Sequence, residues 1–465
     1  MPDERLIFKA DLLRRYDLSG PRYTSYPTAP QFKPDFGPAH FREYARRSNI
    51  ANRPLSLYCH VPFCFSPCFY CGCTRLITRD TTRGRHYVKR LLQELRLYQS
   101  LISPEREVVQ LHLGGGTPNF LGVRDLEELM DGMKQAFRLS SRRERDFSIE
   151  IDPRHMPEGY ASALTHLGFN RVSLGVQDLD SQVQRAVNRV QGIDETLDVI
   201  DACRDSGVRS VNIDLIYGLP KQTPDAFRRT LRMVMSARPD RLAVYAYAHL
   251  PALFKGQRRI KSDELPGPEA RLELLRLAIE ELGASGYRYI GLDHFALPTD
   301  DLVQAKEGDG LQRNFMGYTT HSDTDLLGLG MSAISHLGDS FSQNHRDLMS
   351  WEEAVNADRL PVWRGLALSE DDCIRSAVIG QLMCQGAVDV CAIEQRHHID
   401  FALYFRDALV RLSTHVNDGL IRIEPKRIVV TTAGQMLARS VAMCFDRYLS
   451  NKDGTPSSSH YSKLI

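Results

Sequence analysis

Five of the ten cysteines lie between residues 59 and 73, and their spacing is the clearest chemical signal in the chain. Three of them form the motif Cys64-x3-Cys68-x2-Cys71. In a reducing compartment, closely spaced thiols are usually metal ligands or catalytic groups. A structural zinc site normally takes ligand pairs from two separate arms, and no second pair follows here. The loop therefore favours a [4Fe–4S] cluster with three cysteine ligands and one open iron over a zinc site or a redox disulfide.

The remaining cysteines are given other roles. Cys73 is kept outside the cluster, because a single intervening residue makes it awkward for Cys71 and Cys73 to reach two corners of one cubane. The scattered cysteines are interpreted as small buried side chains: Cys203, Cys373, Cys384, Cys391 and Cys444.

The composition predicts a soluble, cytoplasmic protein with a sizeable core. The chain has 465 residues, of which 42% are hydrophobic, and its mean hydropathy is −0.32. The 59 Lys and Arg residues nearly balance 58 Asp and Glu residues, so the net charge of +1 gives no reason to expect a nucleic-acid or membrane-surface partner. The first residues are charged from Asp3 and lead into no apolar segment, and no window predicts a membrane span.

Short apolar runs alternate with amphipathic segments along much of the chain, and this alternation predicts a parallel α/β fold. Strands are expected at 55–61, 108–113, 147–151, 171–176, 211–216, 241–247 and 287–291. Helices are expected between most of them, at 86–101, 123–137, 196–205, 225–237 and 268–285.

Several predicted strands run directly into turn-forming or polar motifs, at 114–118, 152–154, 177–178 and 218–220. Ligands of parallel sheets and barrels bind at these carboxyl ends of the strands. Six or seven strand–helix units are fewer than the eight of a closed barrel, so an incomplete barrel and an open sheet both fit the pattern.

The two ends of the chain differ from this repeating middle. Residues 1–53 contain a segment rich in tyrosine, hydroxyl side chains and proline, which predicts an amino-terminal lid or strap, and residues 54–360 are the predicted catalytic domain. Residues 361–465 carry predicted helices at 370–383 and 401–412 and then a hairpin at 419–432. That order predicts a small, mostly helical, winged-helix-like domain.

The cysteine motif is similar to the signature of the radical S-adenosylmethionine (SAM) enzymes. The chain resembles one family among them in particular, the oxygen-independent coproporphyrinogen III oxidases (dehydrogenases), and the resemblance spans nearly the whole chain. It is carried by residues 21–28 (PRYTSYPT), 58–64 (YCHVPFC), 71–73 (CGC), 114–118 (GGGTP), 150–154 (EIDPR), 175–178 (GVQD), 212–220 (NIDLIYGLP) and 317–320 (GYTT).

This resemblance implies both a fold and a reaction. The fold is a partial parallel (β/α)6-type barrel, with an amino-terminal strap and a small helical carboxyl-terminal domain. The reaction converts two propionate side chains of coproporphyrinogen III to vinyl groups without dioxygen, giving protoporphyrinogen IX in haem biosynthesis. It requires a 5′-deoxyadenosyl radical made from SAM at a [4Fe–4S] cluster, because an unactivated propionate does not lose CO2.

The family binds two SAM molecules, and the resemblance implies residues for each. The cluster-bound SAM takes Tyr58, Gly115, Glu150 and Ile334, and the second SAM takes Tyr70, Gly116, Thr117, Gln177, Arg189, Asp214 and Ala248. Tyr58 and Glu150 are also the residues nominated for catalysis, although SAM itself carries the radical.

Some of these positions carry a signal of their own. Glu150 alternates with apolar neighbours at a strand end, where its carboxylate suits a ribose hydroxyl, but a solvated or salt-bridged glutamate also fits. Asp214 is a charge in a strand expected to be buried, which is costly unless it is paired or ligand-bound. Arg189 suits a SAM carboxylate, but a surface arginine is commoner. Ile334 and Ala248 enter only through the resemblance.

Other candidates leave two interpretations open. Arg22, with Tyr23 and Tyr26, forms either a lid that meets substrate carboxylates or a structural strap. Three histidines near strand ends suit proton donation or substrate contact, although such residues are more often hydrogen-bonded within the core: His60, His249 and His294.

Two rival functions are compared with the oxidase. A haem-binding relative in the same superfamily would share the cluster and barrel, but residues 21–28 and 71–73 resemble the oxidases instead. A zinc-stabilised binding module would need a basic recognition face, for which Lys426 and Arg427 are weak support. The oxidase would also need an electron donor for the cluster and a terminal electron acceptor, and a monomer is expected.

Overall fold

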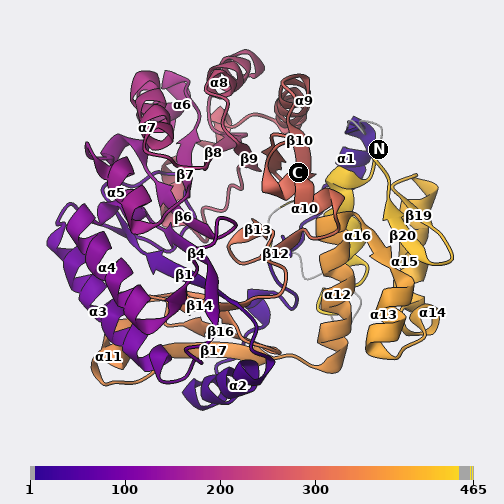
Figure 1. Cartoon of the computed structure of the whole chain (residues 1–465). Coiled ribbons are helices and arrows are strands. Elements are labelled where there is room, and N and C mark those ends of the chain that lie inside the picture. Colours follow the sequence, from indigo (N-terminus) through magenta and orange to yellow (C-terminus); the bar gives the residue numbers. More distant parts are fainter. Residues whose placement is uncertain (1–5, 450–460, 462, 464–465) are drawn as a thin grey trace. The chain divides into compact units, whose positions relative to one another are not determined.

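The computed structural model describes residues 6–449, 461 and 463, and it divides into two compact units (Figure 1). The first unit contains residues 6–31, 268–322 and 368–449, and the second contains residues 32–267 and 323–367. These units differ from the three consecutive domains expected from the sequence, since the amino-terminal segment is shared between them and residues 268–322 group with the carboxyl-terminal helices.

A mixed sheet forms the centre of the second unit. Strands β1, β4, β6, β7, β8 and β9 correspond to the first six predicted strands and pair in parallel, and β14 adds a further parallel strand beside β1. The strands are β1 (Leu55–Val61), β2 (Phe63–Cys64), β3 (Leu76–Ile77), β4 (Glu107–Gly115), β5 (Arg138–Leu139), β6 (Asp146–Ile151), β7 (Arg171–Gln177), β8 (Ser210–Tyr217), β9 (Arg241–Ala246), β14 (Asp325–Leu329), β15 (Ile334–His336), β16 (Ser340–Asn344) and β17 (Val362–Ala367).

The parallel strands run in the order β9-β8-β7-β6-β4-β1-β14, and β15, β16 and β17 extend this sheet in antiparallel fashion. In the part of the chain that the structure describes, β9 and β14 do not pair to close a ring. The strand-helix repeat therefore builds an incomplete barrel, as the resemblance implied.

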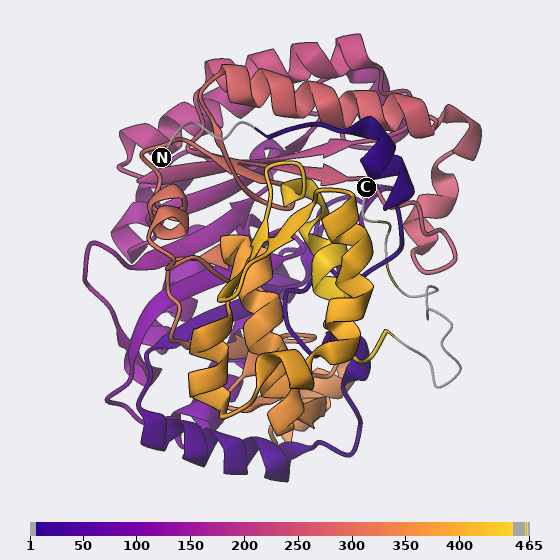
Figure 2. The same ribbon diagram turned by 90° about the vertical axis from the view of Figure 1, so that its right-hand side faces the viewer.

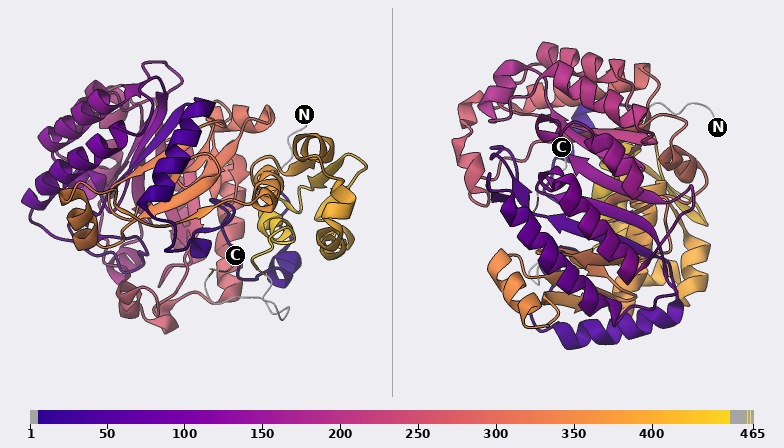
Figure 3. Two further views of the ribbon diagram at one scale, coloured as in Figure 1. Left: turned by 90° about the horizontal axis from the view of Figure 1, so that it is seen from below. Right: turned by 60° about the vertical axis from the view of Figure 1, so that its left-hand side comes forward.

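Helices follow the parallel strands and lie along the outer face of the sheet (Figures 1 and 3). In α8, Thr223 accepts the Ala226 N–H as the helix cap, Pro224 is the first helical residue, and Phe227 and Leu231 are fully buried one turn apart. The helices of this unit are α2 (Pro38–Ala51), α3 (Thr82–Gln99), α4 (Val123–Ala136), α5 (Tyr160–Leu167), α6 (Ser181–Ala186), α7 (Ile193–Asp205), α8 (Pro224–Ser236) and α11 (Leu348–Asn356).

The inner face of this sheet is polar and partly open. Along β6 the residues Phe147, Ile149 and Ile151 are buried, whereas Ser148 and Glu150 between them are partly exposed. The same alternation continues in β7 and β8. A closed barrel fills its interior with packed branched side chains, so this face instead offers space and hydrogen-bonding groups to a ligand.

The last predicted strand, at 287–291, is present but does not continue the parallel pattern. Strand β10 (Arg288–Gly291) pairs antiparallel with β11 (His294–Ala296) and belongs to the first unit. Only two residues separate the strands, and Leu292 between them has φ of 50°, so the chain turns straight back instead of crossing over through a helix. The parallel strand β14, which the sequence analysis missed, is short and buried along its whole length.

The first unit is mostly helical and contains the predicted hairpin as β19 and β20, to which β18 adds a third strand (Figure 2). The expected helix at 401–412 is divided in two at Phe405. The elements are α1 (Ala10–Arg15), α9 (Pro268–Ala284), α10 (Asp301–Glu307), α12 (Glu370–Gln385), α13 (Val390–His397), α14 (Phe401–Tyr404), α15 (Arg406–Asn417), α16 (Ala438–Met443), β12 (Gln312–Asn314), β13 (Gly317–Thr319), β18 (Ala387–Asp389), β19 (Ile421–Ile423) and β20 (Arg427–Val430). None of the described helices is long and apolar enough to cross a membrane.

The amino-terminal tyrosines lie in the core of this unit. Tyr23 is 4% exposed and donates a hydrogen bond of 2.9 Å to Asp446, and Tyr26 is 3% exposed and packs against Tyr448. Arg22 forms an ion pair with Asp293. Of the two interpretations left open for this segment, the structural strap describes the two tyrosines.

Candidate active site at the cysteine loop

The three motif cysteines lie in one loop after β1. Strand β2 ends at Cys64, the Cys64 carbonyl accepts the Thr78 N–H at 3.0 Å, and the Cys68 carbonyl accepts the Cys71 N–H at 3.3 Å. Cys64 and Cys68 are buried and Cys71 is half-buried, so one short loop presents all three motif thiols.

Positive charge surrounds Cys68. The Arg189 Nη1 lies 3.6 Å from the Cys68 Sγ, and the Arg154 Nη2 lies 3.9 Å from the same sulfur. Both arginines also pair with Asp152, at 3.1 Å and 2.6 Å. The Cys68 sulfur therefore lies against two guanidinium groups.

The Asp152 carboxylate balances the two arginines. Burial on its own would raise the pKa of Asp152, but the hydrogen bonds from Arg154 and the charge of Arg189 outweigh that effect and lower the pKa to about 2. Its side chain is 8% exposed, and it also caps the short turn that carries Arg154. Asp152 therefore stays ionised at neutral pH and holds both arginines in place.

The other end of the loop is held by Arg75. Its Nη1 donates to the Cys71 carbonyl and its Nη2 donates to the Cys68 carbonyl, both at 3.1 Å. The Cys73 N–H donates to the Cys71 Sγ at 3.4 Å. A hydrogen bond from the Cys73 thiol lowers the pKa of Cys71, and the charge of Arg75 adds to this effect although burial opposes it. Cys71 is thus the sulfur of this pair that ionises, and Cys73 supports it.

The Gly114–Gly116 run lets β4 end against the cysteine loop. Gly115 has φ of +119°, and a Cβ at Gly116 would stand 2.7 Å from backbone atoms of Pro62 and Phe63. Only glycine fits there without moving the loop. The following residue, Thr117, donates from its backbone to Phe63 O at 2.8 Å and from its hydroxyl to the Cys64 Sγ at 3.3 Å.

Glu150 and Tyr58 line the partly open inner face of the sheet. Gly115 N–H donates to Glu150 Oε2 at 3.1 Å, and the His112 Nε2 lies 3.3 Å from Oε1. The burial of Glu150 opposes its ionisation, but hydrogen bonding and the charge of His112 outweigh it, so the pKa lies below the usual value. The Glu150 side chain is 42% exposed, which leaves acceptor positions on its carboxylate free for a ligand. The Tyr58 ring stacks on His112 at 5.9 Å.

Asp214 lies in β8, beside Gly175 of β7. Its carboxylate accepts hydrogen bonds from Ser173 at 3.0 Å and from Asn212 at 2.9 Å. Burial, with a smaller contribution from the negative charge of Glu150, raises the pKa of Asp214 to about 6. Asp214 is thus a carboxylate whose hydrogen-bond donors in the described structure are uncharged.

Side chains from neighbouring strand ends complete this region. Gln177 ends β7 with φ of +69°, and a Cβ at Gly175 would stand 3.0 Å from its Nε2 and 3.2 Å from the Arg189 Nη2. Gln177 and Arg189 therefore converge over Gly175, whose carbonyl also accepts from Arg189.

Tyr70, Ala248 and Ile334 are held by backbone contacts. The Gln257 Nε2 donates to Tyr70 O at 2.9 Å and to Ala248 O at 3.1 Å. The Ile334 backbone packs so closely on Gly328 that a Cβ there would stand 2.6 Å from Ile334 O, and Gly328 is the partner of Tyr58 in the sheet. The fold thus places these residues on the same unit as the cysteine loop.

The candidate histidines differ in their surroundings. His60 is 5% exposed, its Nδ1 lies 3.0 Å from the Tyr58 hydroxyl and its Nε2 lies 2.9 Å from Thr74 O, and burial lowers its pKa. It is a hydrogen-bonded core histidine. The half-buried His249 contacts the Tyr247 hydroxyl at 2.9 Å, and His294 of the first unit lies edge-on to the Tyr318 ring.

The sequence analysis missed several residues that hold this site together. Asp152 and Arg154 belong to the quoted EIDPR segment, but nothing in the linear sequence shows that they face Cys68. In β4 the polar Gln110 and His112 alternate with leucines, and this alternation could have placed His112 on the inner face of the sheet. Gln257 lies in a short 3-10 helix, Lys255–Arg259, which the sequence analysis did not predict.

Comparisons with known proteins show which proteins this chain is similar to. The sequence profile of the radical SAM superfamily matches residues 58–234. A protein of Pseudomonas aeruginosa described as oxygen-independent coproporphyrinogen III oxidase is 50% identical over 446 residues, which cover 96% of this chain and 97% of that protein. The protein of the same description from Escherichia coli is 44% identical over 97% of this chain and 98% of its own length.

A solved structure shows the same fold. It was published as "Coproporphyrinogen III oxidase (HemN) from Escherichia coli is a Radical SAM enzyme", and it matches with a TM-score of 0.91 and 43% identity over 96% of this chain and 100% of that one. Similarity at this level over nearly the whole length identifies a family as well as a fold. The chain therefore belongs to the oxygen-independent coproporphyrinogen III oxidases of the radical SAM superfamily.

Proposed function

We propose how this chain carries out the reaction of its family, the oxygen-independent oxidation of coproporphyrinogen III in haem biosynthesis. The chain is a radical SAM oxidoreductase. Two propionate side chains of the substrate become vinyl groups, and protoporphyrinogen IX is the product. When bound, a reduced [4Fe–4S] cluster with SAM supplies the radical that removes a hydrogen atom from each reacting propionate, which then loses CO2.

In this proposal, Cys64, Cys68 and Cys71 bind three irons of the cluster and leave the fourth open to SAM. The donor set fits such a group, because the three sulfurs share one loop and two arginines stand against Cys68. Burial raises the pKa of the Cys64 thiol to about 11 despite the hydrogen bond from Thr117, so iron must displace a proton there. We expect the loop to be ordered by the cluster and to release protons as it binds.

The residues at the strand ends orient two SAM molecules. Glu150 keeps free acceptor positions for ribose hydroxyls of the cluster-bound SAM, together with Tyr58, Gly115 and Ile334. Asp214 offers a negative charge to the cationic groups of the second SAM, and Arg189 lies within reach of its carboxylate. Tyr70, Gly116, Thr117, Gln177 and Ala248 line the same second site.

The observation that carries the proposal is the convergence of Arg189, Asp152 and Cys68, which joins a residue assigned to SAM to a ligand of the cluster. Arg189 lies 121 residues after Cys68 in the sequence. A zinc-stabilised module would need neither Arg189 nor Arg154 beside this cysteine. The electron donor, the terminal electron acceptor, the monomeric state and the cytoplasmic location belong to the proposal as well.

The test is an anaerobic assay of the reconstituted protein with dithionite, SAM, coproporphyrinogen III and an added electron acceptor. We expect both protoporphyrin and 5′-deoxyadenosine, in a ratio of about one to two because two propionates react. Cys68→Ala should give neither product, and Cys391→Ala in α13, outside the loop, should behave like the wild-type protein.

The outcomes separate the alternatives. Deoxyadenosine without protoporphyrin would retain the radical chemistry but contradict the substrate. Neither product from protein with a full complement of iron would favour a haem-binding relative. Zinc in place of iron would contradict the cluster itself.

A further inference from the structure

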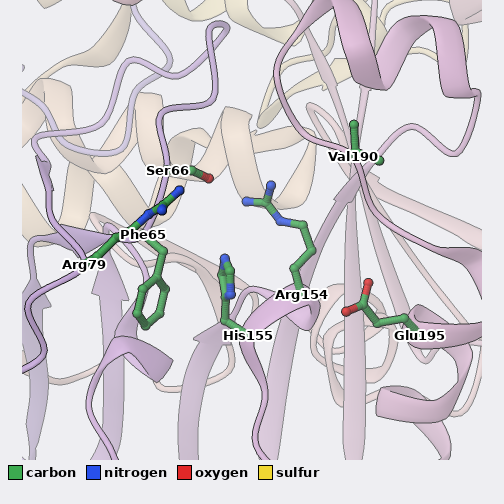
Figure 4. Close-up of a pocket in the computed structure, with 7 residues that line it drawn as sticks. All are labelled: Phe65, Ser66, Arg79, Arg154, His155, Val190 and Glu195. Carbon is green, nitrogen blue, oxygen red and sulfur yellow. The ribbon is translucent and has the colours of Figure 1, made fainter.

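The second unit contains a pocket of about 490 Å³ that adjoins the cysteine loop (Figure 4). Two of its lining residues, Phe65 and Ser66, lie between Cys64 and Cys68, and Arg154 and His155 come from the turn after β6. The pocket is completed by Arg79, Val190 and Glu195.

This pocket shares no lining residue with the positions assigned to SAM, yet it reaches the cluster ligands. Arg154 lines the pocket, and its Nη2 lies 3.9 Å from the Cys68 Sγ. Ser66 is two residues from both Cys64 and Cys68. A molecule seated here would contact residues of the cysteine loop and none of the positions assigned to SAM.

Two of the five polar side chains that line the pocket, those of Arg79 and Arg154, are guanidinium groups. Figure 4 shows the side chains of Arg79, Arg154 and His155 directed toward a common space beside Ser66, with Glu195 to one side. Arg79 is exposed, and among the described residues it forms no ion pair with a carboxylate. Arg154 already pairs with Asp152, so Arg79 is the cation that remains available to a partner.

The rim of the pocket is accessible to a macromolecule. Val190 is 66% exposed, and it offers an apolar contact beside the charged groups. The Phe65 ring packs at a tilt against the His155 ring, with 4.4 Å between the ring centroids, and this contact holds the cysteine loop against the turn after β6. A small, fixed, charged patch with an apolar contact is typical of transient encounters, in which complementary charge sets the association rate.

We propose that this pocket is the docking site of the electron donor, an acidic electron-transfer protein that places a carboxylate against Arg79. The inference rests on the proposed position of the cluster. For each SAM cleaved, one electron leaves the reduced flavin or iron–sulfur centre of the donor and enters the cluster, so the donor is oxidised by one electron and the cluster is reduced by one. Charge complementarity and closeness to Cys68 select this surface.

The test uses the reconstituted full-length enzyme and a small acidic flavodoxin, reduced to its hydroquinone, as the probe. We expect Arg79→Glu to slow cluster reduction by flavodoxin at least tenfold at low salt, and to weaken flavodoxin binding at least tenfold by calorimetry. Arg46→Glu, which makes the same charge change at an exposed position of α2, should stay within twofold of the wild-type protein. High salt should reduce the difference between the variants.

Reduction by dithionite separates a failure of the docking site from a failure of the proposed function. Arg79→Glu should form protoporphyrin at the wild-type rate with dithionite, because the small reductant does not need the pocket. If flavodoxin reduces Arg79→Glu and Arg46→Glu equally fast, the docking site is elsewhere. If Arg79→Glu slows cluster reduction by free reduced flavin mononucleotide as much as reduction by flavodoxin, the pocket binds the flavin itself. That result would also overturn the proposal. A wild-type protein that is inactive even with dithionite would instead contradict the proposed function.

Discussion

Asp152 directly follows β6 and Asp214 lies within β8 of the same sheet, yet their surroundings differ. Asp152 faces the guanidinium groups of Arg154 and Arg189, and its pKa is lowered to about 2. Asp214 accepts hydrogen bonds only from uncharged groups in the described structure, and burial raises its pKa to about 6. The chain itself balances the first charge and leaves the second without a counterion.

This difference distinguishes a residue whose charge is paired within the protein from a residue whose charge is available to a ligand. A buried ion pair with good geometry is satisfied within the protein, and removing one partner is strongly destabilising. A buried carboxylate without a cation lowers stability at neutral pH, and such a feature persists where function requires it. We interpret Asp152 as the residue that positions Arg189 and Arg154 beside Cys68, and Asp214 as a ligand-binding group.

The largest expected effect is the loss of the Asp152 charge. Asp152→Asn should lower the free energy of unfolding by about 3–5 kcal/mol at pH 7, because it leaves two buried arginines facing each other. The lowered pKa of Asp152 contributes stability above pH 3.8, which is lost as the pH falls towards about 2. Urea unfolding at pH 7 and at pH 3 measures the change. An equal difference between variant and wild type at both pH values would show that the ion pair is not the cause.

The comparison predicts that removal of the Asp214 charge raises the free energy of unfolding, whereas removal of the Asp152 charge lowers it. The raised pKa means that the folded state binds a proton more tightly, so stability is lost as the pH rises from about 4 through 6. Asp214→Asn should therefore stabilise the protein without SAM by roughly 2–3 kcal/mol at pH 8, at 1.36 kcal/mol per pKa unit, and should change little at pH 4. Denaturation midpoints at the two pH values test this. A loss of stability at pH 8 would mean that the carboxylate is already balanced.

The third prediction concerns ligand affinity. If Asp214 faces a cation of the second SAM, protonation of its carboxyl should weaken that site about tenfold between pH 7.5 and pH 5, since its pKa is about 6. Glu150 and His112 also influence Asp214 electrostatically, so Asp214→Asn is the necessary control and should bind SAM weakly at both pH values. Equilibrium dialysis with the reconstituted enzyme measures the affinity. A pH dependence that survives in Asp214→Asn would assign it to another group.

The smallest expected effect comes from Ser173, whose hydroxyl donates to Asp214 at 3.0 Å. Ser173→Ala removes one hydrogen bond to the carboxylate, so the pKa of Asp214 should rise further and stability at pH 8 should fall by about 1 kcal/mol. The same substitution in the Asp214→Asn background should have a smaller effect. Additive losses in a double-mutant cycle would show that the two side chains act independently.

Sequence reasoning succeeded where the signal is local. The spacing of Cys64, Cys68 and Cys71 lies within one turn-rich loop, and the six strands from β1 to β9 show a short apolar run followed by a polar turn. It missed β14, and it located β10 but not its antiparallel direction. Strand β14 resembles any short apolar run, and the direction of β10 depends on a two-residue turn that looks like an ordinary loop in the sequence. Tyr23 and Tyr26 suggested a lid because their burial depends on residues more than 400 positions away.

The sequence by itself determined the chemistry of this protein: which thiols stand together, which strands end in glycine or carboxylate, and which family the motifs resemble. Those properties depend on neighbours in the chain, and a strand or loop motif keeps them wherever it is placed. Only the tertiary structure decided that Arg189 and Asp152 meet at Cys68, 121 residues before Arg189 in the chain, and that the Asp214 carboxylate accepts hydrogen bonds from the uncharged Ser173 and Asn212. The physical reason is that the order of strands in the sheet sets these contacts, and that order follows from packing of the whole unit.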